Sequence, residues 1–197
     1  MIVSINPENP QKRLIKRVVE VLESGGLIAY PTDTFYGIGC DLFNKKGIQL
    51  IHKLKNRPLK KPFSIICDSL KEISRYAQVS NYAYKTMKRS LPGPYTFILE
   101  ATKLVPKIML TKRKTVGIRV PDNKICLEIV RTLGRPIIST SAGYDDPLSI
   151  QEAYSAYLDI IIDGGVIYPR PSSVVSLIDD VPEVIRVGKG EVSSFIT

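Results

Sequence analysis

The amino-acid sequence predicts a single α/β domain built on a twisted sheet that mixes parallel and antiparallel strands. Short apolar runs typical of buried strands alternate with amphipathic stretches typical of helices along the whole chain. No internal repeat, low-complexity tract or linker divides the 197 residues, of which 44% are hydrophobic. We therefore expect one domain over 1–197, with its core within about 10–190.

The first half of the chain alternates predicted helices and strands. The first helix has an apolar stripe from Leu14 to Leu22. Ser69 and Glu72 have capping-box spacing, and Asn81 is expected to cap the helix after that. The elements expected are a helix from Pro10 that ends at Gly25 and Gly26, strand 27–30, helix 45–54, strand 63–66, a helix from 69 towards 77, a helix from 81 that ends at 91–94, and strand 95–99.

The second half predicts the same alternation. A helix over 123–133 is closed by Gly134, and the capping-box spacing of Ser149 and Glu152 predicts another helix that leads to the apolar run 160–162. The strands expected are 115–120, 137–139, 173–178 and 183–187, the last two joined as a hairpin across 179–180.

Positive charge is concentrated in two stretches of the chain. Residues 42–67 and 101–121 together contain thirteen Lys and Arg and no Asp or Glu, whereas the formal net charge of the whole chain is +9. The remainder is therefore net negative. A localised positive surface of this kind indicates a phosphate-bearing partner, or two solvated lysine-rich faces.

Cysteine and histidine usage excludes several classes of site. Cys40, Cys67 and Cys126 lie far apart, and the single histidine, His52, falls in a lysine-rich helical stretch. Neither a disulfide framework, a resident metal site nor a Ser-His-Asp hydrolase is indicated. No apolar run is long enough to cross a membrane, and the first residues lack a signal-peptide pattern. We expect a cytoplasmic protein.

Lys55 and Arg57 are candidates for binding phosphate. They follow the predicted helix 45–54 two residues apart, so an extended backbone would point both side chains to one side. Lysine supplies a compact charge and arginine a two-pronged fork, a common pairing around polyphosphate.

Polar residues on two predicted strands form a second candidate group. Thr115, Gly117 and Arg119 share one face of a strand whose other face is apolar. The arginine needs a partner, which is either a structural carboxylate or the carboxylate or phosphate of a ligand. Ser139 and Ser141 share a side at a strand end, where open α/β sheets tend to bind ligands.

The run 30–41, Tyr-Pro-Thr-Asp-Thr-Phe-Tyr-Gly-Ile-Gly-Cys-Asp, follows a strand and precedes a helix. Its hydroxyls and glycines offer hydrogen bonds and close backbone approach to a ligand, although an ordinary loop is equally consistent with the pattern.

Together these stretches resemble the YrdC/YciO family of threonylcarbamoyl-adenylate synthases and their relatives. The matching segments occur in family order over nearly the whole chain: 25–41, 55–58 (Lys-Asn-Arg-Pro), 92–99 (Pro-Gly-Pro-Tyr-Thr-Phe-Ile-Leu), 115–121 (Thr-Val-Gly-Ile-Arg-Val-Pro), 139–142 (Ser-Thr-Ser-Ala) and 163–165 (Asp-Gly-Gly). The resemblance implies a single twisted sheet curved around a basic, concave cleft.

The resemblance also implies an activity. Family members convert L-threonine, bicarbonate and ATP with Mg²⁺ into threonylcarbamoyl-AMP and pyrophosphate, and a partner transferase then modifies an adenosine of tRNA. By position, Thr34 helps to hold threonine and Arg119 faces its carboxylate, while Lys55, Arg57 and Lys61 meet the ATP phosphates. The remaining nucleotide-pocket positions are Thr115, Ser139, Ser141, Ser173 and Arg186.

One departure from the family pattern bears on activity. Synthase members commonly read Ser-Ala-Asn where this chain reads Ser141-Ala-Gly143, so an amide side chain is absent. The runs 6–11 and 112–119 resemble the YciO branch in particular. We therefore expect a nucleotidyltransferase that forms the adenylate slowly.

Two other functions remain open on the sequence. One is a YciO-type module that binds double-stranded RNA, tRNA or ribosomal RNA with weak or no synthase activity, and the other is hydrolysis of a related adenylate. The thirteen basic residues fit both an enzyme and an RNA-binding module. The hydroxyls and Arg119 favour a small ligand, and no RNA-recognition motif is visible.

Overall fold

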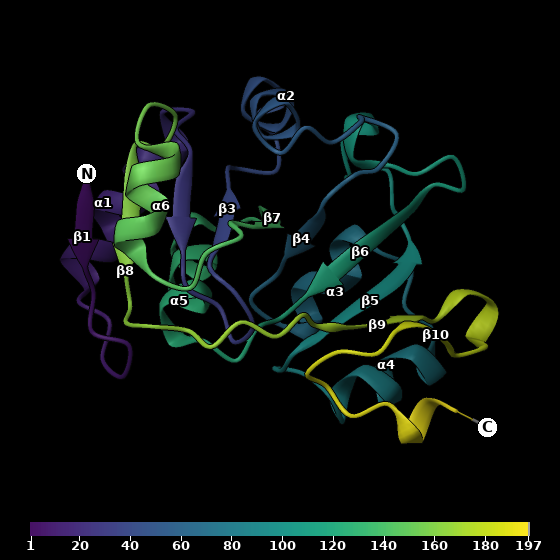
Figure 1. The fold of residues 1–197 in the computed structure, drawn as a ribbon. Helices are drawn as coiled ribbons and strands as arrows, with labels where there is room; N and C mark the ends of the chain where they lie inside the picture. Colours follow the sequence, from purple (N-terminus) through teal and green to yellow (C-terminus); the bar gives the residue numbers. More distant parts are fainter. Residues whose placement is uncertain (197) are drawn as a thin grey trace.

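A computed structural model describes residues 1–196 and shows one α/β domain built on a ten-stranded mixed sheet (Figure 1). Four neighbouring pairs of strands are parallel and five are antiparallel. The strands lie in the order β1 (Ile2–Ser4), β8 (Ile160–Asp163), β2 (Ile28–Tyr30), β3 (Gly37–Gly39), β7 (Ile137–Ser141), β4 (Ser64–Ile66), β6 (Thr115–Arg119), β5 (Tyr95–Glu100), β9 (Ser173–Ser176) and β10 (Glu183–Arg186).

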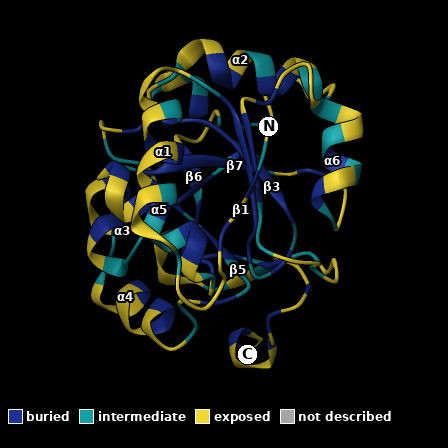
Figure 2. Ribbon diagram, turned by 90° about the vertical axis from the view of Figure 1, so that its left-hand side faces the viewer, coloured by how far each residue is buried: buried dark blue, intermediate teal, exposed yellow. Residues whose placement is uncertain are grey.

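Helices cover both faces of this sheet. They are α1 (Lys12–Glu23), α2 (Lys45–Leu54), α3 (Leu70–Tyr76), α4 (Asn81–Lys88), α5 (Lys124–Leu133) and α6 (Pro147–Tyr154). Figure 2 shows α1, α3, α4 and α5 on one side of the sheet, α6 on the other, and α2 above the strand ends. Within the described residues, no helix is long and apolar enough to span a bilayer.

Two clusters of buried residues form the core: one contains buried residues of α1 and α5, and the other contains buried residues of α2, α3, α4 and α6. Side chains along β2 and β8 alternate between the two clusters. Ile28 and Ile160 belong to the cluster of α1 and α5, whereas Ala29 and Ile161 point to the opposite side of these strands and belong to the other cluster. Residues near both ends of the described chain also join the domain, because Ile2–Ser4 pairs with β8 and Phe195 packs edge-on against aromatic rings of β5.

Most expected elements are present, and α2 has the predicted bounds. Gly134 closes α5 in the left-handed conformation, and β9 and β10 form the expected hairpin. Two predicted caps are wrong. Ser80 caps α4 in place of Asn81, and Asp146 caps α6 by accepting hydrogen bonds from the N–H groups of residues 148 and 149. Asp146 precedes Pro147, which suits the first position of a helix, so α6 begins before Ser149.

The run 30–41 contains the strand β3, which the sequence analysis missed. β3 pairs with β2 on one side and β7 on the other, so it joins the two halves of the sheet. A Cβ atom built on Gly39 would lie 2.1 Å from the carbonyl oxygen of Ile138. Glycine is therefore required for the close approach of β3 to β7.

We predict that Gly39→Ala lowers the free energy of unfolding by about 1–3 kcal/mol, because backbone must shift to admit the methyl group. Urea denaturation monitored by circular dichroism measures the change. Gly134→Asn is the control, since Gly134 has nothing within 4 Å of a Cβ atom and a φ of +73° that asparagine tolerates. Equal stability of Gly39→Ala and the wild type would contradict the packing described.

Candidate active site

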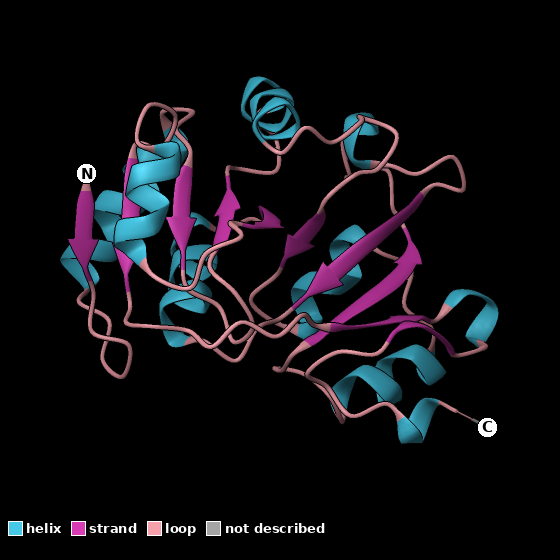
Figure 3. Ribbon diagram, viewed as in Figure 1, coloured by secondary structure: helices cyan, strands magenta, loops and turns pink. Residues whose placement is uncertain are grey.

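A cavity of about 550 Å³ is lined mainly by residues from β3, β4, β5, β6, β7, β9 and β10 and from the segments that precede β3, β4 and β9. Figure 3 shows the long loop after β8 that crosses the lower front of the sheet to reach β9. The polar and charged residues that line it include Thr32, Thr34, Arg57, Lys60, Lys61, Thr96, Thr115, Arg119, Ser139, Ser141, Ser172 and Arg186. None of the described lining residues is Asp or Glu.

Arg119 occupies the centre of this cavity wall. It is the last residue of β6 and is only 8% exposed. Its Nη2 atom donates to Asp33 Oδ1 and to Thr34 Oγ1, both at 2.8 Å. Its Nε is buried and has no hydrogen-bond partner among the described residues. The guanidinium is therefore short of acceptors, which is uncommon for a buried polar group, and it lines a cavity that an anionic ligand can enter.

A chain of hydroxyls fixes the orientation of Arg119. The hydroxyl of Thr32 donates to the carbonyl oxygen of Phe35 at 2.6 Å, so its single proton is committed. The Thr32 hydroxyl also accepts hydrogen bonds from the N–H groups of Thr34 and Phe35, and the Thr34 hydroxyl lies 3.1 Å from it and accepts from Arg119. Thr34 is 0% exposed, and its hydroxyl contacts the Arg119 guanidinium in the cavity wall.

Arg57 lies in the turn between α2 and β4. Its Nε donates to the carbonyl oxygen of Lys61 at 2.7 Å, its Nη2 donates to that of Pro62 at 3.0 Å, and the guanidinium stacks over Phe63. His52 supports the turn from α2, because its Nδ1 lies 2.9 Å from the carbonyl oxygen of Arg57. Arg57 therefore closes the turn that brings Lys61 to the cavity and faces the cavity itself.

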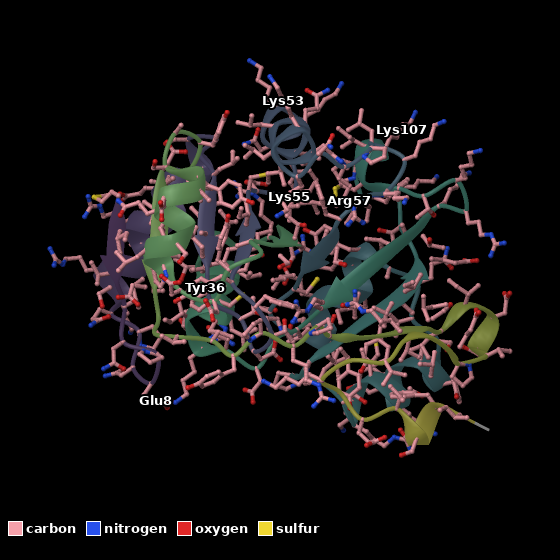
Figure 4. The ribbon with its side chains drawn as sticks, in the orientation of Figure 1. Glu8, Tyr36, Lys53, Lys55, Arg57 and Lys107 are labelled. Atoms are coloured by element: carbon pink, nitrogen blue, oxygen red, sulfur yellow. The ribbon has the colours of Figure 1, made fainter. Side chains whose placement is uncertain are left out.

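Lys55 does not share the direction of Arg57. Asn56 has a φ of +44°, so the backbone between them is not extended, as the sequence analysis had assumed. The Lys55 ammonium instead donates to the Tyr154 hydroxyl at 3.2 Å and to the carbonyl oxygen of Ala142 at 3.3 Å. Figure 4 shows Lys55 and Arg57 beneath α2, whereas Lys53 lies at the outer surface. Lys55 is not among the residues that line the cavity.

The polar residues of β6 and β7 reach the cavity. Thr115 is buried, and its hydroxyl lies 2.7 Å from that of Thr111. Ser139 is buried and Ser141 is exposed, and the Ser141 hydroxyl accepts a hydrogen bond from the Gly143 N–H group at 3.1 Å. The structure thus brings Thr115, Ser139 and Ser141 together with Arg119, although they come from distant parts of the chain.

The end of the cavity at β9 and β10 is built by Ser172 and Arg186. Both Nε and Nη2 of Arg186 donate to the Ser172 carbonyl oxygen, at 3.0 and 2.8 Å. Ser173 faces away from the cavity, is 0% exposed, and binds the Gly188 N–H group and the carbonyl oxygen of Gly190. Neighbouring residues of an extended chain point to opposite sides, which places Ser172 and not Ser173 at the wall.

The cationic side chains lie in partly desolvated surroundings. Burial lowers the pKa of the Arg57 guanidinium, and burial together with repulsion from Arg119 lowers the pKa of Arg186. Arginine stays protonated in proteins even so. Because Arg57 and Arg186 have no carboxylate within salt-bridge distance among the described residues, a bound anion would find their charge uncompensated.

Some of the wall could not be assigned from the sequence. Thr96 and Ser172, whose hydroxyls lie 2.9 Å apart, and Asp33, which pairs with Arg119, carried no spacing signal of their own. The carboxylate partner anticipated for Arg119 is this aspartate. No group of three or more His, Cys, Asp or Glu that could hold a metal occurs in the part of the chain that the structure describes.

Comparisons with known proteins place the fold and the site in context. The model of the Sua5/YciO/YrdC family, described as "Telomere recombination", matches residues 20–188. YciO of Escherichia coli is 41% identical over 98% of this chain and 97% of its own length, and its crystal structure superposes with a TM-score of 0.95. A protein of Methanocaldococcus jannaschii named as a putative threonylcarbamoyl-AMP synthase is 33% identical over 96% of this chain and 92% of its own length.

Sua5 of Pyrococcus abyssi, crystallised in complex with L-threonine, superposes with a TM-score of 0.88 at 28% identity, over 95% of this chain and 57% of Sua5. The resemblance noted in the sequence is thereby confirmed. This chain belongs to the Sua5/YciO/YrdC family, which includes threonylcarbamoyl-AMP synthases.

Proposed function

We propose that this protein binds L-threonine and ATP in the cavity and converts them, with bicarbonate, into threonylcarbamoyl-adenylate and pyrophosphate. The observation that carries the proposal is Arg119, whose guanidinium is buried, short of acceptors and set in a wall of hydroxyls and cations. The relatives named as threonylcarbamoyl-AMP synthases support the activity, and the L-threonine complex of Pyrococcus abyssi Sua5 supports the substrate.

The threonine end of the cavity is assigned to Arg119. A carboxylate would accept hydrogen bonds from the guanidinium donors that Asp33 and Thr34 leave free, such as Nε–H, and the buried surroundings strengthen that interaction because water screens it little. Thr34 and Asp33 would hold the guanidinium in place, and Thr115 lines the same wall.

The triphosphate is assigned to the other cations that line the cavity. Arg57, Lys60 and Lys61 from the turn after α2 and Arg186 from β10 would neutralise the triphosphate. Ser139 and Ser141 would donate to phosphate oxygens. Ser173 would act indirectly, by holding the segment 188–190. Mg²⁺ would accompany ATP on its phosphate oxygens and supply charge neutralisation there.

The reaction needs alignment and charge neutralisation more than a protein base. The threonine amino group adds to bicarbonate with loss of water, and a carboxylate oxygen of the resulting carbamate attacks the α-phosphorus as pyrophosphate departs. The cavity residues would hold the carboxylate and the triphosphate in line and stabilise the charge on the leaving pyrophosphate. The adenylate would then serve a transferase that modifies tRNA.

RNA binding without catalysis is the less supported alternative. It depends on exposed lysines such as Lys53 and Lys107, which lie at the outer surface and not in the cavity. The buried hydroxyls around Arg119 have no role in that alternative.

We predict that Arg119→Lys weakens threonine binding about ten- to a hundredfold, because lysine keeps the charge beside Asp33 but loses the fork. Isothermal titration calorimetry with L-threonine measures the dissociation constant. Arg135→Lys is the matched control, since Arg135 pairs with Asp41 at 2.6 Å outside the cavity. Threonine affinity that is unchanged by Arg119→Lys, or absent in the wild type, would contradict the assignment.

We also predict that Gly143→Asn accelerates adenylate formation about tenfold or more by supplying a hydrogen-bond donor near the phosphates. A Cβ atom at Gly143 would lie 3.9 Å from Lys55 Nζ without a clash, but the φ of +90° strains any side chain there. Threonine- and bicarbonate-dependent pyrophosphate release measures the rate. Gly143→Ala is the control for strain alone. An equal gain in rate in both variants, or no gain in either variant, would refute the role of the amide.

A further inference from the structure

Lys55 is held outside the cavity by a contact that nothing in the family resemblance anticipates. Its ammonium is bonded to the hydroxyl of Tyr154, the last residue of α6, and to the Ala142 carbonyl oxygen. The Tyr154 hydroxyl lies 3.3 Å from the same carbonyl oxygen. Because a carbonyl only accepts and an ammonium only donates, Tyr154 donates its proton to Ala142 and accepts from Lys55. The three groups form a closed triangle of hydrogen bonds that uses the tyrosine proton and two of the three ammonium protons.

The neighbours of the triangle fix the tyrosine ring. Tyr144 packs edge-on against the Tyr154 ring, with centroids 6.0 Å apart, and the Lys55 ammonium lies 5.5 Å from the Tyr154 ring centroid. A Cβ atom at Gly143 would lie 3.9 Å from Lys55 Nζ, which is an ordinary van der Waals distance.

The triangle borders the cavity without being part of it. Ser141 lines the cavity and Ala142 is the next residue, yet neither Lys55 nor Tyr154 is among the lining residues. Lysine has a flexible four-carbon stem, so the ammonium can move between such neighbouring positions at small cost. The position of the Lys55 ammonium therefore depends on which hydrogen-bond acceptors lie within its reach.

We propose that Tyr154 is a positioning residue that tethers the Lys55 ammonium outside the cavity and so lowers the affinity of this site for a nucleotide triphosphate. The statement about affinity rests on the proposed function, whereas the tether itself does not. Removing the hydroxyl leaves Lys55 with the Ala142 carbonyl oxygen alone, and a phosphate at the cavity rim can then compete for the ammonium.

The tether is tested first without any ligand, on the full chain. Wild type and Tyr154→Phe are treated with limiting acetic anhydride, and the acetylation of Lys55 relative to exposed Lys53 is quantified by mass spectrometry. We expect an increase of about threefold or more in Tyr154→Phe, because a hydrogen bond to a charged group is lost. Tyr144→Phe, the same change in the adjoining ring, should leave the ratio unaltered. An unchanged ratio in Tyr154→Phe would overturn the proposal.

The consequence is tested by calorimetry with MgATP at low salt. The dissociation constant should fall about three- to tenfold in Tyr154→Phe, as one more partly exposed charge contact allows, and the gain should vanish in Tyr154→Phe with Lys55→Ala. ATP binding with equal affinity in wild type and Tyr154→Phe would overturn the claim on affinity. Increased acetylation with no ATP binding by either protein would uphold the tether and refute the proposed function.

Discussion

The buried pairing of Arg119 with Asp33 and Thr34 is the interaction on which the site depends. Asp33 also accepts a hydrogen bond from the Asp122 N–H group through its second carboxylate oxygen, and its carbonyl oxygen accepts one from Lys189. One loop between β2 and β3 therefore binds β6, the start of α5 and the C-terminal segment together. Removing one partner of a buried ion pair leaves the other charge uncompensated, so the same pair orders the site and stabilises the fold.

The cations in and beside the cavity divide into those that have hydrogen-bond partners among the described residues of the protein and those that do not. Lys55 donates a hydrogen bond to Tyr154, and Arg57 donates two hydrogen bonds to carbonyl oxygens of its own turn. Lys60 and Lys61 are exposed at the rim. Some of these cations are thus held by hydrogen bonds within the protein, whereas others are exposed to water. A ligand would gain the most binding free energy from the second group, because it displaces only water there. This division distinguishes the site from a uniformly basic surface.

The sequence could predict much of this because the strongest local signals agree with the tertiary structure. The apolar stripe predicts α1, and Gly134 predicts the end of α5. The alternation of polar and apolar residues predicts the two faces of β6. The features that the sequence did not predict have identifiable physical causes. β3 is three residues with two glycines, and the positive φ of Asn56 turned Lys55 away from Arg57. The partnership of Lys55 with Tyr154 spans 99 residues, and no spacing rule connects them.

The central claim is that the cavity joins threonine, bicarbonate and ATP. The most direct measurement incubates the purified protein with ATP, Mg²⁺, ¹³C-bicarbonate and L-threonine, and follows threonylcarbamoyl-AMP by mass spectrometry. The account predicts a slowly accumulating adenylate that carries the ¹³C label, requires all three substrates and falls in Arg119→Lys but not in Arg135→Lys. Binding of both ATP and threonine with no labelled adenylate after many hours would contradict it.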